Sequence, residues 1–331
     1  MNRLRIGLLG CGGVARRHAA AIATLSDQAQ LVACCGRDET KISAFAREFG
    51  AAAWSDTGRM LDEAKLDLLI VALPPYAHAG QVEMAAAAGV HLLVEKPIAL
   101  DMQRASSMVD ATSRAHVVAA CGFMYRFGDA VVRWDRASAA GETGRVGLFA
   151  GQFHCNALHA QWWRERAKSG GQMVEQLIHI VDLARHQLGE PQSVYARAVN
   201  FFHRDLERYD SDDLSAIVLG YDDGRVAVLH ATNGAVPGRW DKSWQIVAER
   251  MTGRFTGWNS ATLVHTSGEI RSEQIETQTD VFVAQLADLV AAIVDGRAPR
   301  VPLAEGAATL RIVLAAQLAA QSRREIRLQV A

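Results

Sequence analysis

The sequence predicts an α/β protein in which a doubly wound parallel sheet is followed by a second α/β domain with a large, mostly antiparallel open sheet. Three observations predict this. In the first third of the chain, apolar segments of strand length alternate with segments of helix length, which is typical of repeated βα units. A glycine-rich loop joins the first of these strands to the first helix. Beyond about residue 124, strand-like segments follow one another with few helices between them.

The first domain starts with a strand at Leu4–Leu9, and each later strand follows a helix-like segment. The segment Leu66–Ala72 is apolar at nearly every position, as expected for a parallel strand buried on both faces. Gly89 suits the position that ends a helix. The remaining predicted elements are a helix at Val14–Leu25, a strand at Leu31–Cys35, a helix at Lys41–Phe49, a helix at Ala77–Ala88, a strand at His91–Val94, a helix at Leu100–Ala115 and a strand at Val117–Cys121.

The second domain is predicted to be mainly strands. Asp222-Asp223-Gly224 is a good hairpin turn between two of them. The predicted strands are Val146–Ala157, Ser193–Phe202, Leu214–Tyr221, Val226–Thr232, Gln245–Ala248 and Arg254–Thr256. Three segments interrupt this pattern and are predicted to be helices, namely Met173–Leu188, Asp280–Val294 and Ala304–Gln321.

The length of 331 residues favours two domains, each large enough to bury its own core. We place a dinucleotide-binding domain at residues 1–123 and a substrate-binding and oligomerisation domain at residues 124–331. No repeat, low-complexity tract or proline-rich linker separates them, so a tight junction near residues 122–126 is expected, with an active site between the domains.

Charge and composition narrow the possible partners. The 35 Lys and Arg nearly balance the 36 Asp and Glu, so no global field attracts nucleic acid or an anionic membrane. A small neutral or polyhydroxylated ligand is easier to fit. No uninterrupted apolar run reaches the roughly 18 residues of a membrane span, and no apolar signal segment begins the sequence, so we expect a soluble cytoplasmic protein.

The five cysteines do not form a recognisable metal or disulfide pattern. None of them belongs to a C-x-x-C pair, and most lie in apolar strand-like segments. We interpret them as small buried hydrophobic residues of a reducing compartment, with a catalytic thiol as the less favoured alternative.

The loop after the first strand has the pattern of a dinucleotide site. It reads G-x-G-x-x-A, in which Gly10 permits the tight turn, Gly12 lets backbone N–H groups approach a pyrophosphate, and Ala15 allows close helix–strand packing. Gly13 and Val14 complete the predicted phosphate-binding turn. A simple turn is the alternative for a lone glycine pattern, but the strand before the loop and the helix after it favour a Rossmann-type cofactor site.

The end of the second strand favours NADP over NAD. A site for NAD normally has an acidic residue there to bind the ribose 2′-hydroxyl, whereas this sequence has Gly36 followed by Arg37, which can pair with a 2′-phosphate. The alternative is that Arg37 is a solvated loop residue and Asp38 binds the ribose.

Two further motifs make a family resemblance specific. Leu73-Pro74-Pro75-Tyr76-Ala77-His78 follows the Leu66–Ala72 strand, and Val94-Glu95-Lys96-Pro97 ends the next one. With the glycine loop, these motifs resemble the Gfo/Idh/MocA oxidoreductases, the family of glucose-fructose oxidoreductase and inositol dehydrogenase. The resemblance continues through residues 122–127, Trp163-Arg164 and the segment from Gly170 to Asp182, so it covers essentially the whole chain.

The resemblance implies a Rossmann domain followed by an α/β domain whose open sheet is often used for oligomer contacts, and hence a homodimer or homotetramer. The family's Glu-Lys-Pro falls on Glu95, Lys96 and Pro97, and its lysine lies beside the substrate oxygen and the nicotinamide. A lysine at a buried strand end is partly desolvated and can donate a hydrogen bond to a developing alkoxide; a surface lysine is the alternative. By the same resemblance, Leu73, Pro74, His78, Glu95 and Arg126 lie at the cofactor.

The second-domain segment after Gly170-Gly171 resembles the family's D-x-G-x-H-x-x-D. His179 takes the place of the family's general acid/base, whereas Glu175 stands where Asp is commoner and Leu177 where Gly is commoner. On a helix Glu175 and His179 share one face, so the carboxylate can orient the imidazole. Glu175 either contacts the substrate or acts only through His179, and a satisfied core histidine is the structural alternative. Leu177 is expected to narrow the pocket.

Other candidates depend more on the resemblance than on a pattern. Tyr125, Trp163 and Arg164 are placed at the substrate, where an aromatic face can pack on the C–H side of a sugar ring. Tryptophans are as often core residues, and a structural ion pair is the alternative for Arg126. No set of side chains has the spacing of a metal site, so no metal is expected.

These features predict an NAD(P)-dependent oxidoreductase that acts on a secondary alcohol, or its ketone, in a sugar, glycoside or cyclitol. In the oxidative direction His179 would accept the hydroxyl proton and Lys96 would stabilise the oxygen. Three alternatives stay open: reduction or oxidation of a non-sugar substrate such as a cyclic dihydrodiol or an imine, a redox-neutral reaction with retained cofactor, and a non-catalytic dinucleotide-binding regulator. The regulator is the less favoured alternative, because a protein without catalytic activity would not need both Lys96 and His179.

Overall fold

A computed structural model describes residues 3–156 and 160–328 of the chain. The chain divides into two compact units, one formed by Met1–Met124 with Asp280–Ala307 and the other by Tyr125–Thr279 with Ala308–Ala331. The fold class predicted from the sequence is confirmed, because the first unit holds a six-stranded parallel sheet and the second a nine-stranded, mostly antiparallel one.

The sheet of the first unit has the strand order β3-β2-β1-β4-β5-β6, with every pair parallel. Its central strands are buried on both faces, so they form from continuous apolar segments and not from an alternating pattern. The order reverses between β1 and β4, and a doubly wound sheet places its ligand at that point. The strands are β1 (Leu4–Leu9), β2 (Ala29–Cys35), β3 (Ala52–Trp54), β4 (Leu68–Val71), β5 (His91–Val94) and β6 (Ala119–Cys121).

Helices connect these strands, and several begin at an aspartate. Asp38, Asp56 and Asp101 each accept a hydrogen bond from a backbone N–H of the helix that they precede. The helices of the first unit are α1 (Gly13–Thr24), α2 (Glu39–Phe49), α3 (Thr57–Glu63), a 3₁₀ turn at Pro75–Ala77, α4 (Gln81–Ala87), α5 (Met102–Arg114) and α10 (Val281–Asp295).

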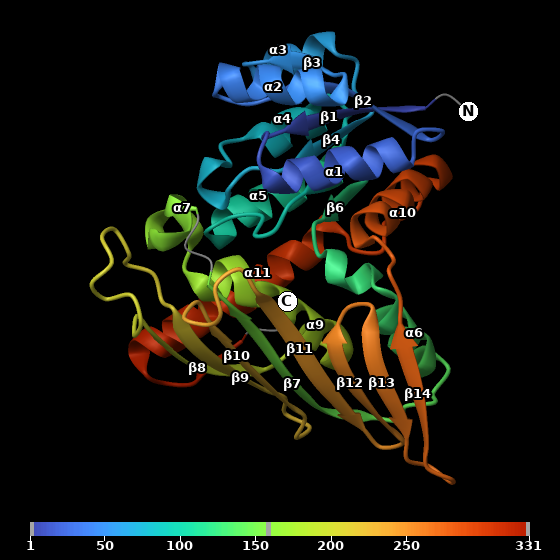
Figure 1. The fold of residues 1–331 in the computed structure, drawn as a ribbon, viewed down its shortest axis with the longest axis vertical. Coiled ribbons are helices and arrows are strands. Elements are labelled where there is room, and N and C mark those ends of the chain that lie inside the picture. The colour runs from blue at the N-terminus through green and yellow to red at the C-terminus, as the bar shows by residue number, and fades with distance from the viewer. Residues whose placement is uncertain (1–2, 157–159, 329–331) are drawn as a thin grey trace. The chain divides into compact units, whose positions relative to one another are not determined.

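Helix α10 departs from the domain division expected from the sequence, which placed residues 280–307 with the second domain. It packs on α1, where the Phe282 ring lies 5.1 Å from the His18 ring, and the Gln285 amide donates a hydrogen bond to the Cys121 carbonyl at 3.1 Å. Figure 1 shows α1 and α10 side by side. The chain therefore returns to the first unit after β14 and then enters the second unit again, where β15 pairs with β8.

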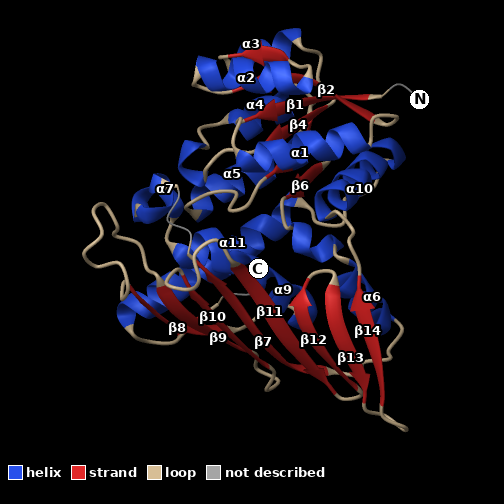
Figure 2. Ribbon diagram, in the orientation of Figure 1, coloured by secondary structure: helices blue, strands red, loops and turns tan. Residues whose placement is uncertain are grey.

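The second unit is built on one large sheet with the order β14-β13-β12-β11-β7-β10-β9-β8-β15. Among the described pairs of this sheet, only β7 and β10 are parallel. Figure 2 shows the strands of the second unit as one sheet. The strands are β7 (Val146–Cys155), β8 (Ser193–Val199), β9 (Leu214–Gly220), β10 (Val226–Thr232), β11 (Trp240–Ala248), β12 (Met251–Gly257), β13 (Ser260–His265), β14 (Arg271–Glu276) and β15 (Ile326–Arg327).

One face of this sheet is covered by helices and carries the core of the unit. Phe149 and Phe153 of β7 alternate with more exposed residues and point to the covered face, against which α9 packs. The helical segments are a 3₁₀ turn at Met124–Phe127, α6 (Asp129–Ala139), α7 (Gln161–Arg164), α8 (Arg166–Ser169), a π-helical turn at Met173–Leu177, and α9 (Ile178–Leu188).

Helix α11 (Leu303–Ser322) is the last helix of the described chain and is followed by β15. By length and composition it is the one helix in the described part of the chain that is apolar enough to cross a membrane, with a mean hydropathy of 1.3. Leu310, Val313 and Ala316 on this helix are fully buried in the protein. The core helix of a soluble protein can have the same length and apolar composition.

Most of the long elements lie where the sequence predicts them, and the 11-residue helix α6 is an exception. Helix Ala77–Ala88 is in fact a 3₁₀ turn and a separate helix α4, and the strand predicted at Gln245–Ala248 begins five residues earlier, at Trp240. The predicted strand end at Ala157 lies outside the described residues. Elements that the sequence did not predict are β3, α3, α6, α7, α8, β13, β14 and β15.

Candidate active site

The glycine loop after β1 adopts a conformation that requires glycine. Gly10 has φ +100°, and a Cβ atom there would lie 2.5 Å from the Ala72 carbonyl oxygen. The same Cβ would lie 3.5 Å from Cδ2 of Leu73, so the loop lies directly beside the segment that follows β4. The turn therefore brings two of the predicted cofactor segments together at the carboxyl ends of adjacent strands.

The start of α1 is open to an anionic ligand. Gly12 precedes the helix with an extended backbone, and a Cβ atom at Gly12 or Gly13 would meet no atom within 4 Å. No side chain caps the helix and no acidic residue lies in its first turn, where Val14 is exposed and Ala15 is buried against the sheet. The first N–H groups and the positive end of the helix dipole are thus available to a pyrophosphate.

Alanine substitutions should separate the two roles of these glycines. We expect Gly10→Ala to destabilise the protein by about 1–3 kcal/mol because it forces a Cβ atom into a left-handed turn against Ala72. Gly12→Ala should leave the melting temperature unchanged and weaken dinucleotide binding, because its Cβ atom fills the open space above the loop. Thermal unfolding and dinucleotide titration measure both. Unaltered dinucleotide affinity in Gly12→Ala would contradict the assignment.

The end of β2 lies next to the glycine loop. A Cβ atom at Gly36 would be 3.9 Å from the sulfur of Cys11, which lies between Gly10 and Gly12. Arg37 is exposed. The Asp38 carboxylate caps α2 by accepting the Lys41 N–H at 3.1 Å and also pairs with the Lys41 ammonium at 3.3 Å, so its oxygens are already engaged within α2.

The segment after β4 is fixed by its own backbone. Pro74 precedes the 3₁₀ turn, and its carbonyl accepts the Ala77 N–H at 2.9 Å. The buried His78 ring forms a hydrogen bond with the Leu73 carbonyl at 3.3 Å, and burial lowers the pKa of His78. A neutral imidazole is therefore favoured at the position expected near the nicotinamide.

Lys96 follows β5 and is held by its buried neighbours. The Glu95 carboxylate accepts the Lys96 backbone N–H at 3.2 Å, and its other oxygen bonds Nε2 of the buried His18 at 2.7 Å. A Cβ atom at Gly122 would lie 2.7 Å from this carboxylate, so the packing around it is close. Glu95 thus orients the backbone at Lys96, and the Lys96–Pro97 peptide bond is cis.

In the second unit, Glu175 and His179 lie on adjacent turns of different kinds. Met173–Leu177 is a π-helical turn, and α9 begins at Ile178, so the predicted single helix is locally widened. Such π turns occur frequently at functional sites. Glu175, Leu177 and His179 are all buried. Gly171 lies two residues before the turn, and a Cβ atom there would lie 2.5 Å from Oδ1 of Asp212.

The His179 imidazole lies within a group of aromatic rings. The Tyr125 ring stacks on it with centroids 4.3 Å apart, and Phe153 lies parallel to it at 6.4 Å. Burial raises the pKa of Tyr125 well above its ordinary value, and the negative charge of nearby Glu175 adds to the shift. The Tyr125 phenol therefore stays protonated and can donate a hydrogen bond.

Arg126 forms a buried ion pair. Its guanidinium donates two hydrogen bonds to Asp182, at 2.8 and 2.6 Å, and Asp182 also accepts the Thr309 hydroxyl at 3.3 Å. Arg126 and Asp182 are 3% and 1% exposed. Arg126 thus forms a structural ion pair, which is the alternative to a cofactor contact.

Trp163 joins the aromatic group through a second tryptophan. Its ring meets that of Trp240 edge to face at 5.8 Å, and Trp240 in turn meets Phe153 at 5.9 Å. Arg164 ends the short helix α7, and its backbone carbonyl accepts the N–H groups of Asp210 and Ser211. The second unit therefore brings Tyr125, Trp163 and His179 into one connected set of rings.

Sequence reasoning missed several residues of this set. Lys242 of β11 lies 5.7 Å from the Phe153 ring and 5.0 Å from the Trp258 ring. The buried Cys155 thiol has two acceptors for its one S–H group, the Gln176 side-chain oxygen at 3.4 Å and the Asn233 side-chain oxygen at 3.2 Å. Trp240, Lys242 and Trp244 alternate with the polar Asp241 and Ser243, and this alternation is the signal in the sequence for a strand that begins before Gln245.

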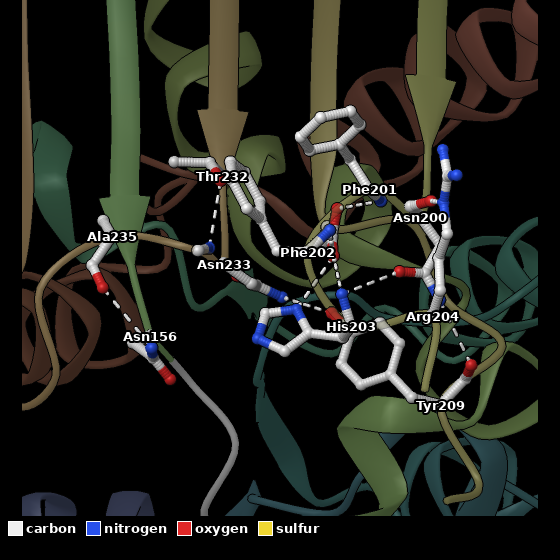
Figure 3. Close-up of polar contacts among 12 residues, drawn as sticks. Asn156, Asn200, Phe201, Phe202, His203, Arg204, Tyr209, Thr232, Asn233 and Ala235 are labelled. Atoms are coloured by element: carbon white, nitrogen blue, oxygen red, sulfur yellow. Dashed lines mark hydrogen bonds and ion pairs between the residues drawn. The ribbon is translucent and has the colours of Figure 1, made fainter. Parts of the chain in front are cut away.

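A loop after β8 is anchored beside Asn233. The buried Asp213 carboxylate accepts the N–H groups of Phe201, Phe202 and His203 at 2.7–2.9 Å, as well as a hydrogen bond from the His203 ring. Asn233 donates to the Tyr209 hydroxyl at 3.3 Å, which connects this loop to the Cys155 side of the site. Figure 3 shows these polar contacts.

No group of three or more His, Cys, Asp or Glu side chains that could hold a metal ion lies within residues 3–156 and 160–328. All five cysteines are free thiols, and four of them are buried. The chemistry of the described side chains is that of acid–base groups and of a dinucleotide loop.

Comparison with known proteins agrees with this arrangement. An oxidoreductase family with an NAD-binding Rossmann fold matches residues 4–123, and the GFO/IDH/MocA C-terminal domain matches residues 131–253. Glucose-6-phosphate 3-dehydrogenase of Bacillus subtilis (strain 168) is 31% identical over 185 residues, which cover 54% of this chain and 52% of that protein. The alignment thus spans about half of that relative's length.

Two further similarities extend over the full chain. Myo-inositol 2-dehydrogenase of Thermotoga maritima is 23% identical over 344 aligned positions, which cover 98% of this chain and 99% of that protein. The solved structure of levoglucosan dehydrogenase in complex with NADH and L-sorbose superimposes with a TM-score of 0.93 at 20% identity, covering 100% of both chains, and shows the common fold. The chain belongs to the Gfo/Idh/MocA family of oxidoreductases, with an NAD(P)-binding Rossmann domain followed by the family's C-terminal domain.

Proposed function

We propose that this protein is an NAD(P)-dependent dehydrogenase that oxidises a secondary alcohol of a sugar, glycoside or cyclitol, or reduces the corresponding ketone. The observation that carries the proposal is the buried His179 imidazole, which lies flat against Tyr125 with Glu175 one turn earlier. A histidine in this setting is suited to exchange a proton with a substrate hydroxyl. The relatives named glucose-6-phosphate 3-dehydrogenase and myo-inositol 2-dehydrogenase support a polyhydroxylated substrate.

The residues of the first unit fit a dinucleotide. Gly10 makes the turn, and the open backbone at Gly12 and Gly13 with the free start of α1 would hold the pyrophosphate. Leu73, Pro74 and His78 follow β4 at the same edge of the sheet and would border the nicotinamide. The bound cofactor supplies a hydride acceptor or donor.

Side chains of the protein would accept the hydroxyl proton of the substrate and stabilise the negative charge on its oxygen. In oxidation, His179 would accept the hydroxyl proton while the carbon-bound hydrogen leaves with its electron pair toward the cofactor, so that a carbonyl forms. Lys96 would donate a hydrogen bond to the same oxygen while negative charge develops on it. Glu175 would orient His179, and Tyr125 would hold the ring by stacking.

The aromatic group is suited to a sugar ring. Trp163 and Trp240 meet edge to face, and aromatic rings of this kind can pack on the C–H groups of a sugar. Arg164 ends the helix that carries Trp163 and is proposed as a substrate contact. We further propose that the protein forms a homodimer or homotetramer through its second unit, as the family resemblance implies.

The preferred cofactor is proposed to be NADP. Arg37 is exposed next to the glycine at the end of β2, whereas the Asp38 carboxylate already caps α2 and pairs with Lys41, which favours the cation as the contact to the ribose. We expect Arg37→Ala to weaken NADP+ binding about tenfold, because a charge-assisted contact to the 2′-phosphate is lost. NAD+ binding should be unchanged. Titration of both cofactors measures this.

The control for that experiment is Arg47→Ala, which removes the same charge from an exposed position of α2. It should alter neither affinity. Equal losses for NADP+ and NAD+ in Arg37→Ala would contradict a specific role at the 2′-phosphate.

The activity itself is tested by mixing the protein with NADP+ or NAD+ and a panel of sugars, glycosides, cyclitols and cyclic diols. We expect reduced nicotinamide to form with at least one sugar or cyclitol, and its near-ultraviolet absorbance measures this. A signal with cyclic diols alone would favour the non-sugar alternative. No signal in a protein that binds both cofactors would favour a redox-neutral enzyme or a regulator.

A further inference from the structure

Lys242 lies on the helix-covered face of the large sheet. It is opposite Phe153 in the pairing of β11 with β7, and it has the same alternation as the buried Trp244 and Ile246. Asp241, its neighbour in the chain, points to the other face and accepts a hydrogen bond from Gln152. The Lys242 side chain is therefore directed into the second unit, toward the face that α9 and its π turn cover.

Four aromatic rings surround the Lys242 ammonium. Its Nζ atom lies 5.0 Å from the centroid of the Trp258 ring and 5.7–5.9 Å from those of Phe153, Tyr125 and Trp240. The four rings come from four separate segments of the chain. Cation–π attraction from such rings stabilises the charge without using the N–H donors of the ammonium.

The ammonium has no anionic partner in the part of the chain that the structure describes. Neither an ion pair nor a hydrogen bond joins Lys242 to another residue among 3–156 and 160–328. Burial lowers the pKa of Lys242 and outweighs the opposite effect of the nearby Cys155 and Asp241. Its three donors remain available to a ligand.

The same rings connect Lys242 to His179. Tyr125 stacks on the His179 imidazole at 4.3 Å, and Phe153 lies parallel to it at 6.4 Å. We propose that Lys242 binds an oxyanion of the substrate, a carboxylate or a phosphate, beside the hydroxyl group that His179 deprotonates. This inference rests on the proposed dehydrogenase function and narrows its substrate class to acidic sugars.

The expected preference for an anion follows from the surroundings of the Lys242 ammonium. An anion that enters this aromatic-lined site replaces the water that the ammonium has lost, and the low local dielectric strengthens the attraction. A neutral sugar gains no such compensation. The site should therefore select for charge, while the tryptophan rings accept the carbohydrate C–H face.

The test compares one sugar ring with three substituents: D-glucose, D-glucuronate and D-glucose 6-phosphate. Each is titrated calorimetrically into the dinucleotide-loaded protein, and kcat and KM are measured for those that are oxidised. We expect at least one of the two anions to bind about tenfold more tightly than glucose. The stronger of the two identifies the oxyanion as a carboxylate or a phosphate.

Two variants then assign the preference to the ammonium. Lys242→Met keeps an apolar stem among the four aromatic rings. It should weaken the affinity for the preferred anion about tenfold and change the affinity for glucose by less than about twofold. Lys242→Arg keeps the charge and should retain most of that affinity. Lys168→Met, in α8, removes a lysine that pairs with Glu165 and should change neither affinity.

Several outcomes would overturn the proposal: an equal affinity of the wild-type protein for all three ligands, no binding of any, or equal losses for glucose and the anion in a folded Lys242→Met protein. The binding readout is independent of turnover. If none of the three sugars reduces the cofactor, the wider substrate panel decides the dehydrogenase proposal, and the affinities still decide whether Lys242 recognises an oxyanion.

Discussion

Replacing Lys96 by methionine is expected to lower kcat by about 10²- to 10⁴-fold, because the donor that stabilises charge on the substrate oxygen is removed. Methionine has a similar length, and the Glu95 carboxylate still holds the residue 96 backbone N–H and the buried His18. Dinucleotide affinity should therefore stay within about threefold of the wild-type value. Steady-state kinetics with an active substrate and cofactor titration measure the two effects separately.

The matched control is Lys65→Met, which removes an exposed lysine of the same unit. It should leave kcat unchanged. A Lys96→Met protein that turns over at nearly the wild-type rate would remove Lys96 from the mechanism, and a variant that fails to bind the cofactor would assign it to cofactor binding instead.

The second large effect is expected at Arg126. Arg126→Met should destabilise the second unit by about 3–5 kcal/mol, because it leaves the Asp182 carboxylate buried without its bidentate partner. Chemical denaturation followed by tryptophan fluorescence measures the loss. The double variant Arg126→Met/Asp182→Leu should regain most of the stability, since no uncompensated charge remains.

This experiment also decides between the two interpretations of Arg126. A structural ion pair predicts that stability falls while dinucleotide affinity of the folded protein is kept. Wild-type stability combined with a loss of dinucleotide binding would contradict the ion-pair interpretation and restore the cofactor contact that the family resemblance implied.

The first unit was predictable because its signals are local. Buried parallel strands are continuous apolar segments, and each cofactor motif follows its strand directly, as Gly10 follows β1 and Lys96 follows β5. What the sequence did not predict there depends on contacts between distant segments. His18 meets Glu95 across 77 positions, and α10 returns to this unit from the far end of the chain.

The second unit was less predictable because its site is made of residues far apart in the sequence. Tyr125, Phe153, His179, Lys242 and Trp258 come from different elements, and only the pairing of β7 with β11 brings Phe153 and Lys242 together. The helix that carries His179 was predicted from its apolar pattern, whereas the π turn within it has no pattern of its own.

The most direct test of the account follows a deuterium atom. A sugar or cyclitol substrate deuterated at the reacting carbon is incubated with the protein and oxidised NAD(P), and the nicotinamide is examined by mass spectrometry. We expect the label to appear on the reduced nicotinamide in step with ketone formation, and this transfer to be about 10²- to 10⁴-fold slower in Lys96→Met. Release of the label to water, or its retention in a product without net reduction of the cofactor, would contradict a dehydrogenase.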